Sequence, residues 1–112
     1  MEKKVTLFNG APIRDYIYVE DVVEAIILSL ENSFSGILNL GTGKGTSSST
    51  IAKEISKMTN SEIEDLNRSL EWKKRVVLDI EKAQKILNWG PMIDIREGLE
   101  KTIDYYREKI IK

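Results

Sequence analysis

Two arginines are the residues whose type and setting most directly suggest binding chemistry. Arg14 lies between the turn-like segment 9–12 and an apolar run, which is an unusual place for a charge that only aids solubility. Arg68 precedes Glu71 by three residues and lies close to a basic stretch. A guanidinium is a planar fork of donors that matches phosphate oxygens, so both side chains are candidate phosphate ligands. From residue types alone, the alternative is that both are solvated surface charges.

A glycine turn, Gly41-x-Gly43-x-Gly45, stands between a predicted strand and a predicted helix. This setting suits a dinucleotide-binding turn, in which backbone N–H groups hold a pyrophosphate at a helix N-terminus. The spacing departs from that motif, because its third glycine would fall at position 46, where the chain has Thr46. We therefore interpret residues 41–45 as a plain turn between two elements.

Tyr105 and Lys109 form a second pattern, since residues four apart share a helix face and a nearby ammonium lowers the pKa of a tyrosine. They fall on the last predicted helix beside a charged tail, so we interpret them as structural or surface residues.

The chain contains no Cys and no His. This composition excludes thiol chemistry, His-based acid–base chemistry and the usual zinc sites.

The order of the predicted elements indicates an α/β fold with short strands and about four helices. The predicted strands are residues 5–8, an extended run 13–19, 37–40 and 75–78; the predicted helices are about 20–31, one capped by Ser47, one capped by Asp79 and stopped at Asn88, and about 95–110, begun by Asp94 and Glu97. Apolar residues at helical spacing from Val19 to Leu30 place one stripe on the first helix. Residues 60–70 show no clear period and are expected to form a loop.

Composition fits one globular domain over residues 1–112. With 17 basic and 18 acidic residues the net charge is −1, which predicts no broad binding to nucleic acid or to an anionic membrane. No stretch reaches the roughly 18 apolar residues of a membrane span, and we expect a cytoplasmic protein. Three or four short strands form a narrow sheet, and the helices are too few to cover both faces if it is parallel. Part of the complete structure is therefore expected to be missing.

The segment 14–25, R-D-Y-I-Y-V-E-D-V-V-E-A, resembles a signature of the extended short-chain dehydrogenase/reductases that act as NAD-dependent nucleotide-sugar epimerases and dehydratases. Later landmarks follow in the family's order. They are G-I-L-N-L-G-T-G at 36–43, Arg68-x-x-Glu71, the segment 79–91 and the closing helix around 98–106. The resemblance therefore covers nearly the whole chain.

This resemblance implies a Rossmann domain for NAD plus a smaller carboxyl-terminal lobe for the sugar nucleotide, of which the chain matches only the lobe. The family's glycine fingerprint and its catalytic Tyr-x-x-x-Lys and Ser/Thr have no counterpart here. No catalytic, cofactor-binding or metal-binding residue is therefore expected, and NAD belongs to the intact enzyme. By resemblance, Arg14 and Arg68 hold the substrate diphosphate, Glu71 accepts hydrogen bonds from the ribose, and Tyr16 packs near the nucleotide.

The sequence thus predicts a nucleotide-sugar-binding fragment of an epimerase or dehydratase that is inactive alone. Two alternatives stay open: a stand-alone module that binds nucleotide sugars, and a non-catalytic subunit of a split enzyme. The expected partners are a nucleotide-diphosphate sugar and either a separate NAD-binding domain or a second copy. Apolar surface that such a domain would cover is expected to be exposed.

Overall fold

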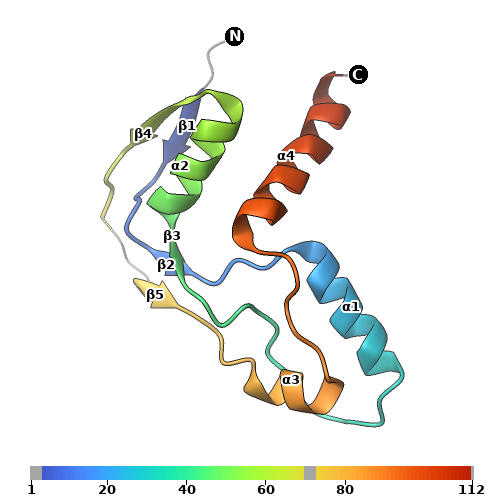
Figure 1. The fold of residues 1–112 in the computed structure, drawn as a ribbon. Coiled ribbons are helices and arrows are strands. Elements are labelled where there is room, and N and C mark those ends of the chain that lie inside the picture. The colour runs from blue at the N-terminus through green and yellow to red at the C-terminus, as the bar shows by residue number, and fades with distance from the viewer. Residues whose placement is uncertain (1–3, 70–72, 112) are drawn as a thin grey trace.

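The computed structural model describes residues 4–69 and 73–111 of the chain, and only the backbone of residues 110 and 111. Its elements, in chain order, are β1 (Lys4–Leu7), β2 (Ile13–Arg14), α1 (Val19–Leu30), β3 (Thr46–Ser47), α2 (Ser48–Thr59), β4 (Glu62–Asp65), β5 (Arg75–Val76), α3 (Glu81–Leu87) and α4 (Ile95–Ile111). The short strands and the helices confirm the predicted α/β class (Figure 1). That residues 1–112 form a single domain stays a prediction.

Two small sheets form the framework. Strands β1 and β4 pair in parallel, with Lys4 opposite Glu62, and α2 packs against both strands. In the second sheet β2 is central, antiparallel to β3 and parallel to β5. Figure 1 shows this second sheet between the β1–β4–α2 unit and the helices α1 and α3. The three-stranded sheet therefore connects the two halves of the molecule.

Strand β4 corrects the expectation of a loop over residues 60–70. Asn60 ends α2 in the left-handed conformation at φ 53°, and the chain then turns into β4. The Lys4 ammonium lies 2.5 Å from a Glu64 carboxylate oxygen across the strand pair. The partner strand β1 is more than fifty residues earlier in the chain, so the pairing leaves no local period in the sequence.

Three of the predicted helix ends are confirmed, whereas the cap predicted at Asp79 is wrong, because Ile80 is the N-cap of α3 and its side chain makes no capping hydrogen bond. Ser47 caps α2 by accepting a 3.2 Å hydrogen bond from the Thr50 backbone N–H. Asn88 stops α3 in the left-handed region at φ 50°. Asp94 accepts a 2.9 Å hydrogen bond from the Glu97 backbone N–H at the start of α4. Each of these residues meets a local requirement of a helix terminus, either a side-chain acceptor for a free N–H group or a left-handed backbone, which is why sequence patterns predict them.

The hydrophobic core is small. It comprises Ala25, Ala83, Leu87 and Trp89, with the partly buried residues Ile17, Leu28, Leu38, Leu40 and Ile86 packed against it. Asp21 is 2% exposed, and its carboxylate accepts 3.1 Å hydrogen bonds from the backbone N–H groups of Met92 and Ile93. The Asp21 carbonyl accepts a 2.9 Å hydrogen bond from the Trp89 indole. One residue thus fastens α1 to the segment that joins α3 to α4.

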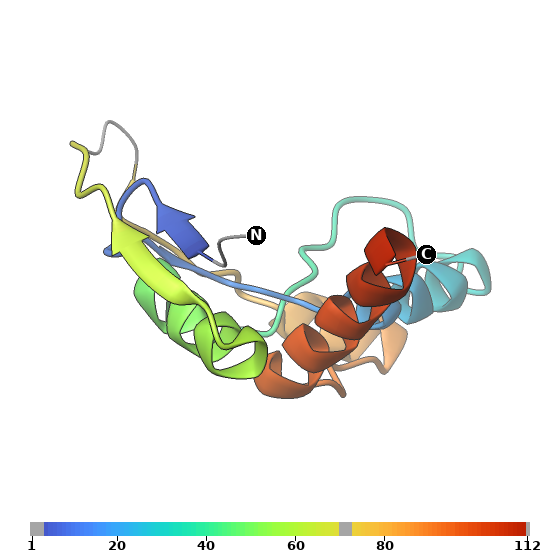
Figure 2. The same ribbon diagram turned by 90° about the horizontal axis from the view of Figure 1, so that it is seen from above.

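The expected strand 37–40 is absent, which corrects the sequence analysis. Residues 37–40 run as an irregular segment beyond the end of α1, visible as the arching loop in Figure 2. Among the described residues, none exchanges a backbone hydrogen bond with this segment. A β-strand needs a ladder of backbone hydrogen bonds to a neighbouring strand, and among the described residues this segment has no such neighbour.

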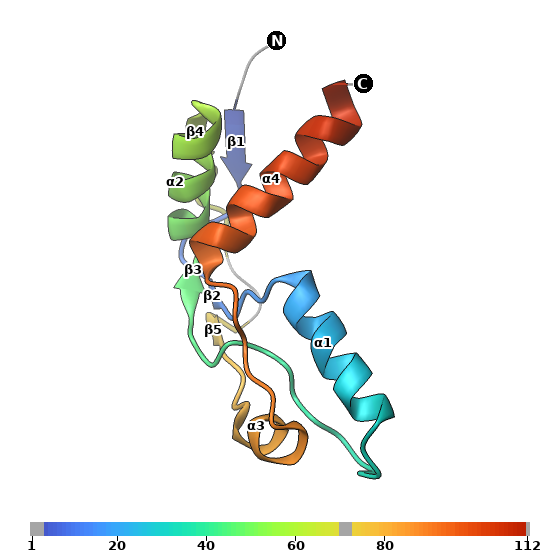
Figure 3. The ribbon, with the colours of Figure 1, turned by 45° about the vertical axis from the view of Figure 1, so that its right-hand side comes forward.

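The extended run 13–19 forms a strand only at Ile13–Arg14, and the run 75–78 only at Arg75–Val76. The molecule is flat, with extents of 51 × 38 × 17 Å. Helix α4 lies beside α2, where Arg107 donates a 3.0 Å hydrogen bond to the Met58 carbonyl (Figure 3). No helix in the described ranges is long and apolar enough to cross a membrane.

Candidate functional site

Arg14 lies on β2, the central strand of the three-stranded sheet, and is half-buried. Its Nη1 donates to the Ile13 carbonyl at 2.8 Å and to the Lys74 carbonyl at 3.3 Å, and its Nη2 donates to the Lys73 carbonyl at 2.8 Å. The guanidinium therefore holds the chain just before β5. Arg14 is not a freely solvated surface charge.

Arg68 is exposed, and its backbone is fixed. Its N–H donates to the Phe8 carbonyl at 2.9 Å, and its carbonyl accepts a 2.7 Å hydrogen bond from the Asn9 amide. Arg68 is thus attached beside the turn after β1, and Arg14 holds the carbonyls of Lys73 and Lys74 just before β5. Glu71, the predicted ribose ligand, lies outside the described residues.

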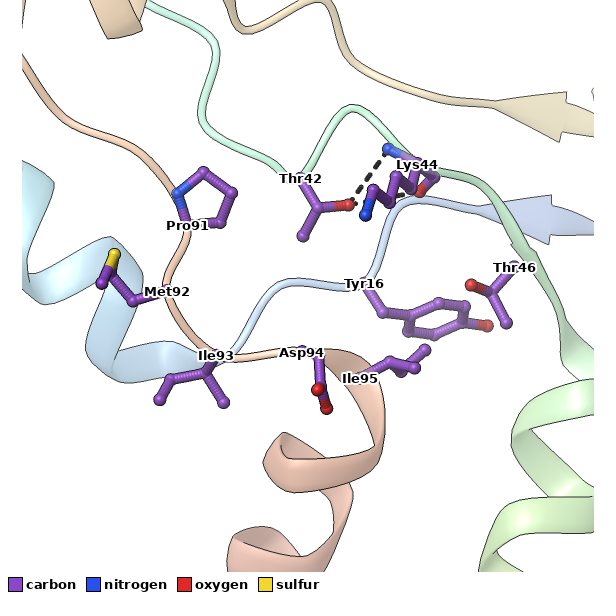
Figure 4. Close-up of a pocket in the computed structure, with 9 residues that line it drawn as sticks. All are labelled: Tyr16, Thr42, Lys44, Thr46, Pro91, Met92, Ile93, Asp94 and Ile95. Atoms are coloured by element: carbon purple, nitrogen blue, oxygen red, sulfur yellow. Dashed lines mark hydrogen bonds between the residues drawn. The ribbon is translucent and has the colours of Figure 1, made fainter.

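Tyr16 lines a cavity of about 280 Å³, together with Thr42, Lys44, Thr46 and the segment 91–95. Figure 4 shows the Tyr16 ring lying towards Thr46, while the Lys44 and Thr42 side chains stand above it. The walls combine an aromatic ring, hydroxyls and an ammonium. An aromatic face and convergent polar groups are typical of small-molecule sites, so the predicted position of Tyr16 near a ligand fits this geometry.

Asp15, which the sequence analysis did not single out, organises the glycine turn. Its carboxylate accepts hydrogen bonds from the Thr42 N–H (2.8 Å), the Thr42 hydroxyl (2.5 Å), the Gly43 N–H (2.9 Å) and the Leu78 N–H (3.4 Å). A Cβ on Gly41 would lie 2.6 Å from an Asp15 carboxylate oxygen, so only glycine permits this approach. Three segments that are distant in sequence therefore meet at one carboxylate, between Arg14 and Tyr16.

This arrangement decides how the glycine turn is used. The N–H groups of Thr42 and Gly43, which a dinucleotide turn would offer to a pyrophosphate, are taken by Asp15. Gly43 has φ 75°, which aims its N–H at that carboxylate. The residues of this turn do not fit NAD, in agreement with the interpretation of 41–45 as a plain turn. The sequence signal for Asp15 was no more than an acidic residue inside the predicted extended run 13–19, 26 residues before the glycine turn.

The ionisation of Asp15 follows from its contacts. Burial by itself raises the pKa of this carboxyl, but the hydrogen bonds from the Thr42 hydroxyl and from the N–H groups of Thr42, Gly43 and Leu78 outweigh it. The net effect lowers the pKa of Asp15 below its ordinary value. The carboxylate is therefore ionised at neutral pH and acts as a fixed internal anion.

Tyr105 and Lys109 lie on α4 as predicted. The Lys109 ammonium lies 5.6 Å from the centroid of the Tyr105 ring, which is packed edge-on against Tyr106. Tyr105 is 55% exposed on a terminal helix, in keeping with a surface role. Within the described ranges, no group of three acidic side chains could hold a metal ion.

Known proteins are similar to this chain in sequence and in structure. A sequence model described as GDP-mannose 4,6 dehydratase matches residues 1–102. UDP-glucuronate 4-epimerase from Thermodesulfobacterium geofontis is 36% identical over 113 residues, which cover 97% of this chain and 35% of that protein. The chain thus spans about a third of the length of this relative.

Solved structures agree. The UDP-glucose 4-epimerase of Thermotoga maritima with UDP-glucose is 30% identical with a TM-score of 0.82, over 97% of this chain and 36% of that one. The UDP-glucose 4-epimerase of Thermus thermophilus in complex with NAD is 27% identical with a TM-score of 0.79, over 96% and 36%. Both likenesses extend over nearly the whole of the present fold.

Proposed function

We propose that this chain binds the diphosphate and ribose of a nucleotide sugar for an NAD-dependent epimerase or dehydratase. The chain belongs to the GDP-mannose 4,6-dehydratase family, as a carboxyl-terminal portion of an extended short-chain dehydrogenase/reductase. The chain supplies substrate binding and positioning. The dinucleotide-binding domain comes from residues beyond this lobe, in the same polypeptide or in another one.

The observation that carries this proposal is the setting of the two arginines, Arg14 on β2 and Arg68 beside the turn after β1. Arg14 fixes the carbonyls of Lys73 and Lys74, and Arg68 begins the loop with an exposed side chain. No described residue forms a hydrogen bond or an ion pair with the Arg68 guanidinium. Its donors are therefore available to an anion, and we propose that Arg14 and Arg68 both contact the diphosphate.

The remaining groups extend the site. Glu71, three residues after Arg68 in the sequence, is proposed to accept hydrogen bonds from the ribose hydroxyls. Tyr16 offers its ring in the cavity of about 280 Å³, where it would pack near the nucleotide. Holding diphosphate and nucleotide in place fixes the sugar relative to the reacting groups of the rest of the enzyme, which is catalysis by orientation.

The test is calorimetric titration of UDP-glucose and dTDP-glucose into the 112-residue chain and its variants. Arg68→Ala is expected to weaken binding by about 10- to 100-fold, the loss of one or two charge-assisted hydrogen bonds. Arg107→Ala removes the same charge from the far end of α4 and is expected to leave binding unchanged. Equal effects of the two substitutions would contradict the proposed diphosphate contact.

The strength of binding also separates the alternatives. Micromolar affinity of the isolated chain would favour a stand-alone module, whereas weak binding favours a lobe that needs its partner domain. We expect no epimerase turnover when NAD is added to the isolated chain, because its sequence has no counterpart of the family's glycine fingerprint and catalytic Tyr-x-x-x-Lys. Measured conversion of any nucleotide sugar would overturn this part of the proposal.

A further inference from the structure

Arg68 is attached to the rest of the fold through its backbone. Its N–H donates to the Phe8 carbonyl at 2.9 Å, and its carbonyl accepts a 2.7 Å hydrogen bond from the Asn9 side-chain amide. Both partners belong to the turn that follows β1, whereas the Arg68 side chain is exposed. The place from which the guanidinium extends is therefore fixed by a turn that lies 59 residues earlier in the chain.

The Asn9 side chain uses both of its polar atoms. Its Oδ1 accepts a 2.8 Å hydrogen bond from the Ala11 N–H, which folds residues 9–11 into an Asx turn, and its Nδ2 donates to the Arg68 carbonyl. Asparagine suits this position because it carries an acceptor and a donor on one planar group. The local turn needs only the acceptor, and the link to Arg68 needs only the donor. The two roles can therefore be separated by substitution.

A second pair of contacts joins the turn after β1 to the turn after β4. The Asp65 carboxylate, at the end of β4, accepts hydrogen bonds from the Gly10 N–H at 3.0 Å and from the Asn67 N–H at 2.8 Å. Asn67 has a left-handed backbone at φ 50°, a conformation that asparagine tolerates. Each turn thus holds the other, and we call the two turns, residues 8–11 and 65–68, the clasp.

The clasp is anchored to helix α2. The Gly10 carbonyl accepts a 3.0 Å hydrogen bond from the Ser49 N–H. The Pro12 carbonyl, directly after the clasp, accepts a 2.9 Å hydrogen bond from the Ser48 N–H. N–H groups in the first turn of a helix have no partner within the helix, so these carbonyls satisfy them. The backbone of Arg68 is thus connected through the clasp to a helix and not to a free segment.

A fixed backbone lowers the cost of binding an anion through Arg68. An arginine that binds an oxyanion loses the freedom of its side chain, and on a free segment it would lose backbone freedom as well. When the backbone is already held, only the side chain has to be ordered. Bidentate contacts also need the planar guanidinium in a defined position. An arginine held in this way therefore binds more tightly than the same residue on a free segment.

We propose that Asn9 is a positioning residue for Arg68: by donating to the Arg68 carbonyl, it fixes the place from which the guanidinium contacts the substrate diphosphate. The inference deepens the proposed function and rests on it for the identity of the anion. Asn9 acts through Arg68 and makes no contact of its own with the ligand. Removing its amide therefore weakens binding only as long as Arg68 is present.

Asn32 is a matched control within the same chain. Its Oδ1 accepts a 2.7 Å hydrogen bond from the Phe34 N–H, and its Nδ2 donates at 3.0 Å to the Ile86 carbonyl, 54 residues away. Asn32 and Asn9 are both half-buried. The two asparagines make the same pair of hydrogen bonds, one to an N–H two residues on and one to a distant carbonyl. Asn9 is the one that holds an arginine.

The test is calorimetric titration of UDP-glucose and dTDP-glucose into the 112-residue chain, Asn9→Ser and Asn32→Ser. Serine keeps an acceptor for the N–H two residues on and adds no charge, but its hydroxyl is one bond closer to the backbone and no longer reaches the distant carbonyl. Asn9→Ser is expected to weaken binding by about 3- to 10-fold, the effect of one hydrogen bond, whereas Asn32→Ser should leave binding unchanged. In an Arg68→Ala chain, Asn9→Ser should have no further effect, because the group that it positions is gone.

A merely structural role of Asn9 would give a different result. Equal changes in affinity from Asn9→Ser and Asn32→Ser would overturn the inference, and so would an effect of Asn9→Ser that persists in the Arg68→Ala chain. Either outcome leaves the proposed function standing, because Arg68→Ala tests that function separately.

Hydrogen exchange at the Arg68 amide is the second measurement. We expect it to be about 3- to 10-fold faster in Asn9→Ser than in the parent and unchanged in Asn32→Ser. An unchanged rate in Asn9→Ser would overturn the inference. Should the serine variants fail to fold, Asn9→Asp and Asn32→Asp repeat the exchange comparison with side chains of unchanged size. If the parent binds neither nucleotide sugar, the proposed function fails, and the Arg68 amide still decides whether Asn9 holds Arg68.

Discussion

Replacing Asp15 by Asn tests whether an internal carboxylate holds the candidate site together. The carboxylate accepts four hydrogen bonds from two other segments, at distances from 2.5 to 3.4 Å. Asn offers one acceptor oxygen and turns its NH₂ group towards N–H donors, so some of these contacts become repulsive. The Gly43 and Leu78 N–H groups share one carboxylate oxygen, and the two Thr42 donors share the other.

The expected cost is about 2 kcal/mol in the free energy of unfolding. Hydrogen bonds to a charged acceptor contribute roughly 1.5–3 kcal/mol each when they are buried. Asp15 is only half-buried, and water can replace part of what is lost, so the sum is well below four such terms. Asp104→Asn is the matched control, because it makes the same chemical change on the exposed face of α4 and should cost less than about 0.5 kcal/mol.

The pH dependence of the free energy of unfolding tests whether the charge of Asp15 causes this stabilisation. The folded state lowers the pKa of Asp15, so its contribution is fully present above the unfolded value near 4 and is lost as pH falls through the folded value. Urea titrations of the parent and Asp15→Asn chains from pH 8 to pH 3 should therefore show curves that converge at the acidic end. Curves that stay parallel down to pH 3, or that coincide at pH 7, would refute the role assigned to this carboxylate.

Three further changes probe the same framework. Asp21→Asn should destabilise the chain by about 3 kcal/mol, because a 2% exposed carboxylate loses its contacts to Met92 and Ile93; the near-ultraviolet signal of Trp89 reports the loss. Gly45→Ala should cost about 1–3 kcal/mol in thermal unfolding, because its Cβ would lie 2.6 Å from a methyl group of Ile13. Raising the salt concentration from 0.05 to about 0.5 M should weaken nucleotide-sugar binding to the parent chain and affect Arg68→Ala less, as calorimetry would show.

Local rules predicted the parts of this fold that local contacts determine. The N-cap at Ser47, the left-handed stop at Asn88 and the cap at Asp94 each involve groups within three or four residues. Arg14 was predicted as a diphosphate ligand by resemblance, and its hydrogen bonds to the carbonyls of residues 73 and 74 could not be predicted from the sequence. They join segments about sixty residues apart, and only the paired strands β2 and β5 bring those segments together.

Asp15 shows why the candidate site was only half predicted. An aspartate beside an arginine in an extended run has no period and no spacing of its own. Its partners are the turn at Thr42 and Gly43 and the chain after β5, which meet only in the folded molecule. The glycines form a recognisable motif in the sequence, but the Asp15 carboxylate that accepts hydrogen bonds from this turn could not be predicted from it. The sequence was interpreted as giving a plain turn at residues 41–45, and it did not predict the carboxylate that accepts hydrogen bonds from the N–H groups of that turn.

The apolar period of helix α1 was interpreted correctly, but it did not predict which face of the helix packs on the core. Periodicity tells which residues share a face, and the stripe from Val19 to Leu30 does share one. It does not tell which face looks inward, since the short residue Ala25 and the hydrogen-bonded Asp21 pack more closely than the larger apolar side chains opposite them. Burial of the small face and exposure of the large one leave the stronger hydrophobic contribution unused within this lobe.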